Sequence, residues 1–99
     1  MLHHVVLVTL KEGVDGTQVD AALEGFASLP PLIPEIRTYD FGREAGISPN
    51  DFGVVMVASF DSKDDFTAYR EHPAHKAFAA DLLRPIAEKI TTAQFFGPV

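Results

Sequence analysis

The residues best suited to chemistry gather in one stretch, from Phe66 to Phe78, which holds two of the 4 histidines and one of the 2 tyrosines. Tyr69 and His75 lie six positions apart, about one and a half turns of a continuous helix. A phenol and an imidazole at the mouth of one small cavity form a usable acid–base pair. A histidine on the inward face of a helix can equally be a core residue that bonds a backbone carbonyl, so both interpretations stay open.

Helix signals on both sides of a proline place these side chains. Ser62, with an acidic residue three positions later, has the spacing of a capping box and predicts a helix that begins just after it. The residue before a proline is pushed out of the helical conformation, so His72 should end that helix and act as a cap or a surface residue. Pro73 suits the first position of a second helix. His75 then shares a face with Phe78 and should point toward the core.

A third candidate lies in the first expected strand. His3 and His4 are adjacent, and neighbouring side chains of a strand point to opposite faces, so the two cannot easily bind one metal ion. The chain also lacks cysteine and the His-Glu-x-x-His spacing of zinc proteases, so no metal site is expected. We expect His4 to approach Tyr69 and His75 from the sheet. The apolar lining of the same cavity should come from Phe26, Val54, Met56 and Phe78.

Hydrophobic patterns predict the elements that position these residues. Strands are expected at residues 3–10, 36–43, 52–60 and 91–96. A helix should begin at the Thr-x-x-Asp spacing of Thr17 and stop at Pro30, and Pro85 should kink or break the second helical region. The order β-α-β-β-α-β predicts a single α+β domain over residues 1–99. Its fold would be ferredoxin-like, an antiparallel sheet with both helices on one face.

The uncovered face of that sheet predicts an assembly. The first and third strands are apolar on both faces, and 46% of all residues are hydrophobic, more than a 99-residue monomer easily buries. Residues on the open face include Val5, Leu7, Val55 and Val57. A homodimer formed through this face would cover them.

Composition excludes several classes of partner. The 8 basic and 14 acidic residues give a net charge of −6, and the basic residues form no cluster, which argues against binding of nucleic acid or an anionic membrane surface. Without cysteine there is no disulfide and no thiol catalysis. No apolar run approaches the ~20 residues that span a bilayer. No leader precedes the first strand, so the cytoplasm is the expected location.

The chain resembles the stress-responsive A/B barrel (Dabb) domain family over nearly its whole length. Two motifs carry the resemblance. One is His4-Val5-Val6-Leu7-Val8, and the other is the string Tyr69-x-x-His72-Pro73-x-His75-x-x-Phe78. Antibiotic-biosynthesis-type monooxygenases share the fold of this family but not the second string. The resemblance implies a homodimer in which two four-stranded sheets form one α+β barrel.

The resemblance also implies a chemistry. One member type, the plant polyketide cyclase that makes olivetolic acid, performs a cofactor-free aldol cyclisation. Its catalytic tyrosine and histidine fall on Tyr69 and His75, and its first-strand histidine falls on His4. Two further polar pocket residues of that cyclase are replaced by Phe26 and Val54, so a more apolar cavity is implied here. Some plant members hold a divalent cation through backbone carbonyls of the loop that matches residues 30–36, and the sequence leaves this open.

Three functions remain open from the sequence. The first is a small-molecule-binding homodimer, with a small apolar or aromatic ligand, whose reaction is unknown. The second is a cofactor-free enzyme, similar to a cyclase or a monooxygenase, that uses His75 and Tyr69. The third is a dimerisation module without catalysis. No cofactor is expected, and the absence of tryptophan counts against the haem-degrading relatives.

Overall fold

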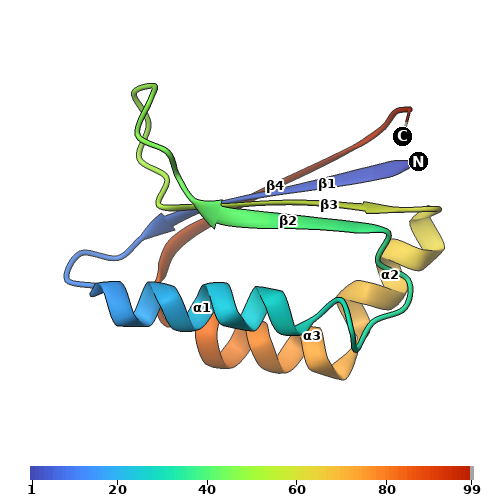
Figure 1. The fold of residues 1–99 in the computed structure, drawn as a ribbon, viewed down its shortest axis with the longest axis horizontal. Helices are drawn as coiled ribbons and strands as arrows, with labels where there is room; N and C mark the ends of the chain where they lie inside the picture. Colours follow the sequence, from blue (N-terminus) through green and yellow to red (C-terminus); the bar gives the residue numbers. More distant parts are fainter. Residues whose placement is uncertain (99) are drawn as a thin grey trace.

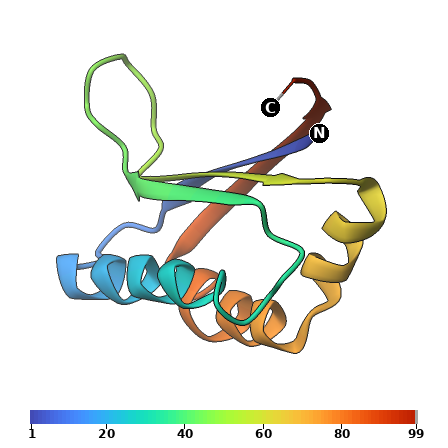
Figure 2. The same cartoon turned by 45° about the vertical axis from the view of Figure 1, so that its right-hand side comes forward.

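The computed structural model describes residues 1–98, which form one four-stranded antiparallel sheet with helices on one face (Figure 1; Figure 2). The strand order is β2-β3-β1-β4, as expected for a ferredoxin-like α+β fold. The elements are β1 (Leu2–Leu10), α1 (Gly16–Ser28), β2 (Thr38–Arg43), β3 (Val54–Phe60), α2 (Lys63–Glu71), α3 (Pro73–Phe78), the π-helical η1 (Ala79–Leu83) and β4 (Ala87–Phe96). The predicted fold class is therefore confirmed.

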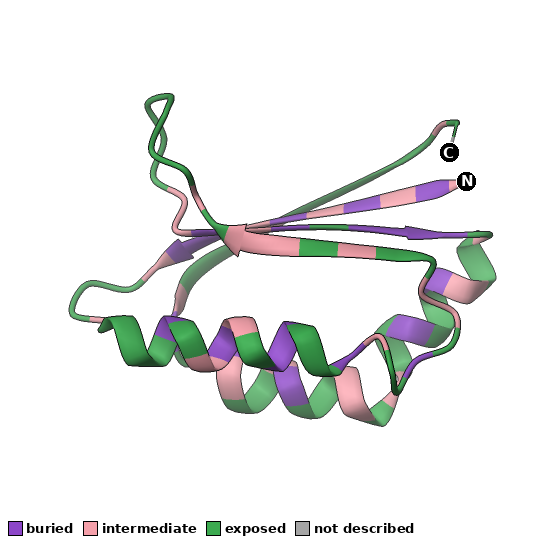
Figure 3. Cartoon of the chain, viewed as in Figure 1, coloured by how far each residue is buried: buried purple, intermediate pink, exposed green. Residues whose placement is uncertain are grey.

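Strand β1 lies inside the sheet, between β3 and β4, and its alternation sets the two faces. His4, Val6 and Val8 are buried toward the helices, whereas Val5 and Leu7 are half-buried on the other side. Figure 3 shows the alternation of buried and half-buried residues along this strand. Because successive strand residues point to opposite faces, this register places His4 on the helix side.

The first helix begins two residues earlier than the sequence predicted. Asp15, not Thr17, is the N-cap, and its carboxylate accepts a hydrogen bond of 3.0 Å from the Gln18 backbone N–H. The Gln18 side chain bonds back to the Asp15 backbone, which completes a capping box. The Thr17 hydroxyl donates to the same carboxylate at 2.6 Å, so it supports the cap rather than forming it.

The second helical region breaks where the proline predicts. Ser62 caps α2, and its hydroxyl accepts a hydrogen bond from the Asp65 backbone N–H at 3.1 Å. His72 has an extended backbone (φ −61°, ψ 134°), ends α2, and caps α3 through Nδ1, which accepts from the Ala74 N–H at 3.0 Å. Pro73 is the first residue of α3. The prediction that His72 is a cap is confirmed.

The last strand is longer than predicted. Helical structure ends at Leu83, ahead of Pro85, and β4 begins at Ala87 rather than at Thr91. The Arg84 N–H bonds the Ala79 carbonyl in the wider π pattern, and Pro85 has no N–H to continue the helix. Pairing with β1, which offers a full edge from Leu2 to Leu10, then extends β4 beyond what its own apolar pattern predicts.

The other face of the sheet has no helix over it (Figure 1). Val5 pairs with Val57 and Leu7 with Val55 across β1 and β3 on this face. Val57 is 40% exposed although it is apolar. No helix within residues 1–98 is long and apolar enough to cross a membrane.

Candidate functional site

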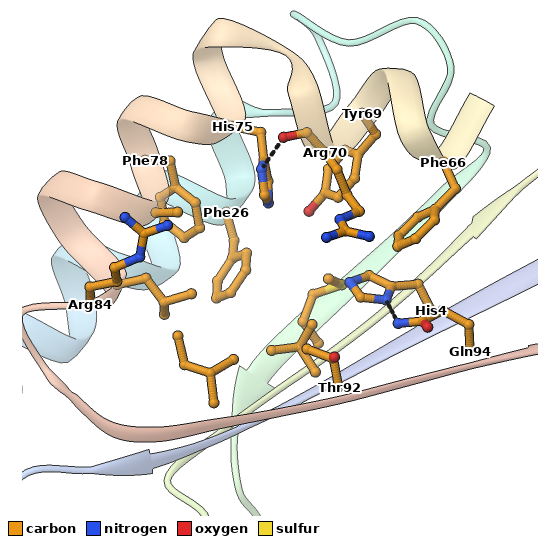
Figure 4. A pocket seen from close by; sticks show the side chains of 15 residues that line it. His4, Phe26, Phe66, Tyr69, Arg70, His75, Phe78, Arg84, Thr92 and Gln94 are labelled. Carbon is orange, nitrogen blue, oxygen red and sulfur yellow. Dashed lines mark hydrogen bonds between the residues drawn. The ribbon is translucent and has the colours of Figure 1, made fainter. Parts of the chain in front are cut away.

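A cavity of about 270 Å³ lies between the inner face of the sheet and the α2–α3–η1 region (Figure 4). Tyr69, His75 and His4 all line it, so the adjacent helices α2 and α3 and the distant strand β1 bring the predicted polar residues together. The other lining residues are Val6, Phe26, Met56, Phe66, Arg70, Phe78, Ala79, Leu83, Arg84, Ile90, Thr92 and Gln94. The volume is close to the lower end of the roughly 300–1,000 Å³ typical of small-molecule sites.

Tyr69 is held by a second tyrosine that the sequence analysis missed. The Tyr69 side chain is 1% exposed, and its hydroxyl lies 2.7 Å from the Tyr39 hydroxyl on β2. Burial raises the pKa of both phenols, to about 12 for Tyr69. The hydrogen bond to Tyr39 opposes that rise in Tyr69, so Tyr69 is the more acidic of the two. Tyr69 is therefore a neutral hydrogen-bond donor at physiological pH.

Tyr69 and His75 are neighbours, but their polar atoms have other hydrogen-bond partners. Their ring centroids are 4.4 Å apart, at an interplanar angle of 49°. The Tyr69 hydroxyl is bonded to Tyr39 instead, and His75 Nδ1 lies 3.2 Å from the backbone carbonyl of Arg70. The physical reason is the helix break, because the last carbonyls of α2 have no partner within the helix and one of them takes the imidazole N–H.

This bond fixes which nitrogen of His75 carries the proton. A carbonyl oxygen only accepts, so Nδ1 must donate, and in the neutral ring Nε2 is then an unprotonated acceptor. Burial lowers the pKa of His75, and the positive charges of Arg70 and Arg84 lower it further, against an opposing effect of the Arg70 carbonyl. The ring points into the cavity in Figure 4, so Nε2 is available there as a base.

His4 is the second neutral imidazole of the cavity. It is 6% exposed, and its ring lies 4.7 Å from the Phe66 ring, centroid to centroid. The Gln94 amide nitrogen donates to Nδ1 at 2.9 Å, which leaves Nε2 as the protonated nitrogen. Burial lowers the pKa of His4 to about 4, with smaller effects from His75 and Arg70. His4 is thus a hydrogen-bond donor beside a base.

The apolar lining differs in part from the prediction. Phe26, Met56 and Phe78 line the cavity, but Val54 does not. Val54 is fully buried at the start of β3, where it pairs with Val8 and packs in the general core. It shares the inner face with Met56 but precedes it by two residues in β3 and is not part of the cavity lining.

Sequence analysis also missed the polar groups contributed by β4 and by the helix ends. Thr92 and Gln94 line the cavity because β4 places them opposite Val6 and His4 of β1, on the helix side of the sheet. Arg70 and Arg84, both exposed overall, also contribute to the lining. Within residues 1–98, no cluster of three or more histidine, aspartate or glutamate side chains is placed to hold a metal ion.

Comparison with known proteins gives the family. A family model described as the stress responsive A/B barrel domain matches residues 2–96. A stress-response A/B barrel domain-containing protein of Arabidopsis thaliana is 30% identical, over 81% of this chain and 75% of its own. An uncharacterized protein of Streptomyces coelicolor is 32% identical, over 81% of this chain and 84% of its own.

Solved structures agree on the fold. A dimeric ferredoxin-like protein of unknown function from Thermobifida fusca superposes with a TM-score of 0.87 at 31% identity, covering 95% of this chain and 88% of its own. A hydroxynitrile lyase from Passiflora edulis has a TM-score of 0.84 at 22% identity, covering 95% of this chain and 90% of its own. SnoaB, a cofactor-independent oxygenase from Streptomyces nogalater, has a TM-score of 0.75 at 17% identity, covering 97% and 91%. The last two likenesses concern the fold alone.

Proposed function

The chain belongs to the stress-responsive A/B barrel domain family, and on that premise we propose that it is a homodimer that binds a small, largely apolar molecule beside His75 and Tyr69. One observation carries the proposal. An unprotonated imidazole nitrogen of His75 and the hydroxyl-bearing ring of Tyr69, 4.4 Å apart between centroids, share the wall of a cavity of about 270 Å³. The aromatic rings of Phe26, Phe66 and Phe78 also line this space.

This arrangement supports proton abstraction next to a carbonyl group. His75 Nε2 would take the proton from an acidic carbon of the ligand, and the electron pair left behind would move onto the carbonyl oxygen as an enolate. The hydroxyl of Tyr69 would donate a hydrogen bond to that oxygen, and His4 Nε2–H would be a second donor. These interactions are strong because the apolar lining lowers the local dielectric constant. Such a step needs no cofactor, and the family resemblance points to the same pair of residues.

The open sheet face supports the homodimer. Val5, Leu7, Val55 and Val57 form one apolar patch without a helix over it. Exposed apolar patches of this kind mark interaction sites, and a second copy of the same face is self-complementary across a two-fold axis. The relative from Thermobifida fusca, at 31% identity, is described as dimeric.

Binding without chemistry is the alternative, and the bond from His75 Nδ1 to the Arg70 carbonyl favours it, because that bond alone would explain a structural histidine. The two enzymes that share the fold, a hydroxynitrile lyase and a cofactor-independent oxygenase, show that the scaffold supports reactions in those proteins. A purely dimerising role would leave the cavity without a ligand.

Hydrogen–deuterium exchange into acetophenone separates these possibilities. We expect the protein to bind acetophenone, seen by NMR shift changes at Tyr69 and His75, and to accelerate exchange of the methyl hydrogens in D₂O. His75→Ala should bind acetophenone but lose the acceleration, whereas His3→Gln, on the opposite sheet face, should retain it. Binding without exchange in the wild type would establish the non-catalytic role. Absence of binding would overturn the cavity proposal.

The assembly is tested separately. Val55→Asp places a charge in the middle of the apolar patch, where burial without a partner is costly, so light scattering should show the mass fall from dimer to monomer. Ala80→Asp adds the same charge on the exposed helical side and should leave the dimer intact. A monomeric wild type at micromolar concentration would contradict the proposal.

A further inference from the structure

We propose that the ligand of this cavity is an acid, a small apolar or aromatic molecule whose carboxylate is held by Arg70 with support from Arg84. This deepens the proposed function and rests on it. The argument begins with the distribution of charge. The chain carries 14 acidic and 8 basic residues, yet the lining contains two arginines and two histidines and no aspartate or glutamate. The cavity therefore has the opposite charge preference from the protein as a whole.

Neither guanidinium has an acidic partner within residues 1–98. The ion pairs found there use the other two arginines, Arg37 with Asp61 and Arg43 with Asp20. Arg70 instead lies over the Phe66 ring, with its guanidinium carbon 5.6 Å from the ring centroid. The arginines on the outer surface are thus paired with carboxylates, and those at the cavity keep their hydrogen-bond donors free.

The positions of the two arginines suit one small ligand. Arg70 comes from the end of α2, and its guanidinium lies between Tyr69 and His4 in Figure 4. Arg84 follows η1 and lies on the far side of His75, near Phe78. Because the two charges come from separate elements, the cavity between them has positive potential from both sides.

The positive charges of the arginines act on both histidines of the cavity. Both guanidinium charges lower the pKa of His75, and the charge of Arg70 lowers the pKa of His4. A carboxylate bound at Arg70 would offset these effects, and guanidinium–carboxylate pairs are commonly bidentate and charge-assisted. The ring of the ligand would then lie against Phe26 and Phe78, with its carbon framework beside His75.

Paired probes of equal shape test the charge preference. Benzoate and benzamide differ in charge but hardly in size, and both can be titrated into the full chain at low salt by NMR or calorimetry. We expect benzoate to bind at least tenfold more tightly than benzamide, with an advantage that shrinks as salt is added. Arg70→Gln should remove most of that advantage, and Arg84→Gln should remove a smaller part. Lys11→Gln, which deletes the same charge on an exposed turn, should leave it unchanged.

A second measurement separates an anion site from a general change of charge. Benzoate should raise the pKa of His75, followed by its ring proton shifts, and benzamide should not. Equal binding of benzoate and benzamide would overturn the carboxylate inference but leave the apolar cavity proposal standing. If neither these probes nor acetophenone binds, the proposed function fails as well. Loss of the dimer in Arg70→Gln, without loss of benzoate binding, would assign this arginine to a carboxylate of the second copy and refute the inference.

Discussion

Replacement of His4 tests whether the cavity holds a truly buried neutral imidazole. Burial lowers the pKa of His4 from 6.5 to about 4, so in the folded state the ring resists protonation. In the unfolded chain the ring binds a proton below pH 6.5. As pH falls from about 6.5 toward 4, the unfolded state therefore binds more protons, and the free energy of unfolding must decrease.

The magnitude follows from the same two values. A drop from 6.5 to about 4 corresponds, at about 1.4 kcal/mol for each pH unit, to a loss of about 3 kcal/mol by pH 4. The 6% exposure of His4 leaves little screening by solvent to reduce this figure. Protonation would also break the hydrogen bond in which Nδ1 accepts from Gln94, which acts in the same direction. Well below pH 4 the contribution of His4 is constant, because the ring is then protonated in both states.

Urea unfolding of the wild type and of His4→Gln, at one protein concentration and at several pH values from 7.5 to 4, measures this loss. Carboxylates and His75 also titrate in that range, so the informative quantity is the difference between the two pH profiles. We expect the wild type to lose about 3 kcal/mol more than His4→Gln. His3→Gln should retain the steep wild-type profile, because it leaves the buried ring in place. Parallel profiles for the wild type and His4→Gln would refute the reasoning and show that water reaches His4.

Three further substitutions probe the elements around the cavity. Tyr39→Phe should cost about 1 kcal/mol in urea unfolding, and it should slow acetophenone exchange more than it weakens acetophenone binding, because only the orientation of the Tyr69 hydroxyl is lost. Gly25→Ala should cost about 1–3 kcal/mol, because the new methyl group would lie 2.5 Å from the Phe78 ring. Asp15→Ala should cost about 1 kcal/mol by removing the N-cap of α1, with benzoate binding unchanged. An unaffected stability in any of the three would contradict the corresponding contact.

Local rules explain what the sequence predicted well. The break at His72 and Pro73 follows from the clash between a proline ring and the preceding residue, which acts whatever the rest of the fold does. The inward face of His4 follows from the two-residue period of a strand. Each of these inferences depends on neighbours within a few residues, so a single sequence was sufficient.

Contacts between elements that are distant in the chain explain what the sequence analysis missed. Tyr39 and Tyr69 are 30 residues apart, and their hydroxyl pair depends on how α2 docks against β2. The sequence placed Tyr69 and His75 beside one cavity but could not give the hydrogen-bond partner of either group. In the structure each group has a different partner. His75 bonds a free carbonyl at the end of α2, and Tyr69 bonds a second phenol, that of Tyr39.

The sequence analysis missed the two cavity arginines for a related reason. Arg70 and Arg84 are exposed and lie in helical surroundings, where such residues usually serve only as solvated surface. Only the three-dimensional structure shows that both flank one cavity and that neither has a carboxylate partner within residues 1–98. Sequence spacing cannot give this information, because pairing depends on which acidic groups lie nearby in space.

The same arginines give the proposed base a dependence on its ligand. In the free protein, burial and two positive charges keep the His75 imidazole neutral, with a pKa below that of an ordinary histidine. A bound carboxylate would offset those charges and move the pKa of His75 upward, toward the neutral range where a general base works best. His75 Nε2 would then be free of a proton before the ligand arrives and more basic once the ligand is bound. A neutral ligand of equal shape would leave His75 a weaker base, so a carboxylate near the reacting carbon would improve both binding and proton abstraction.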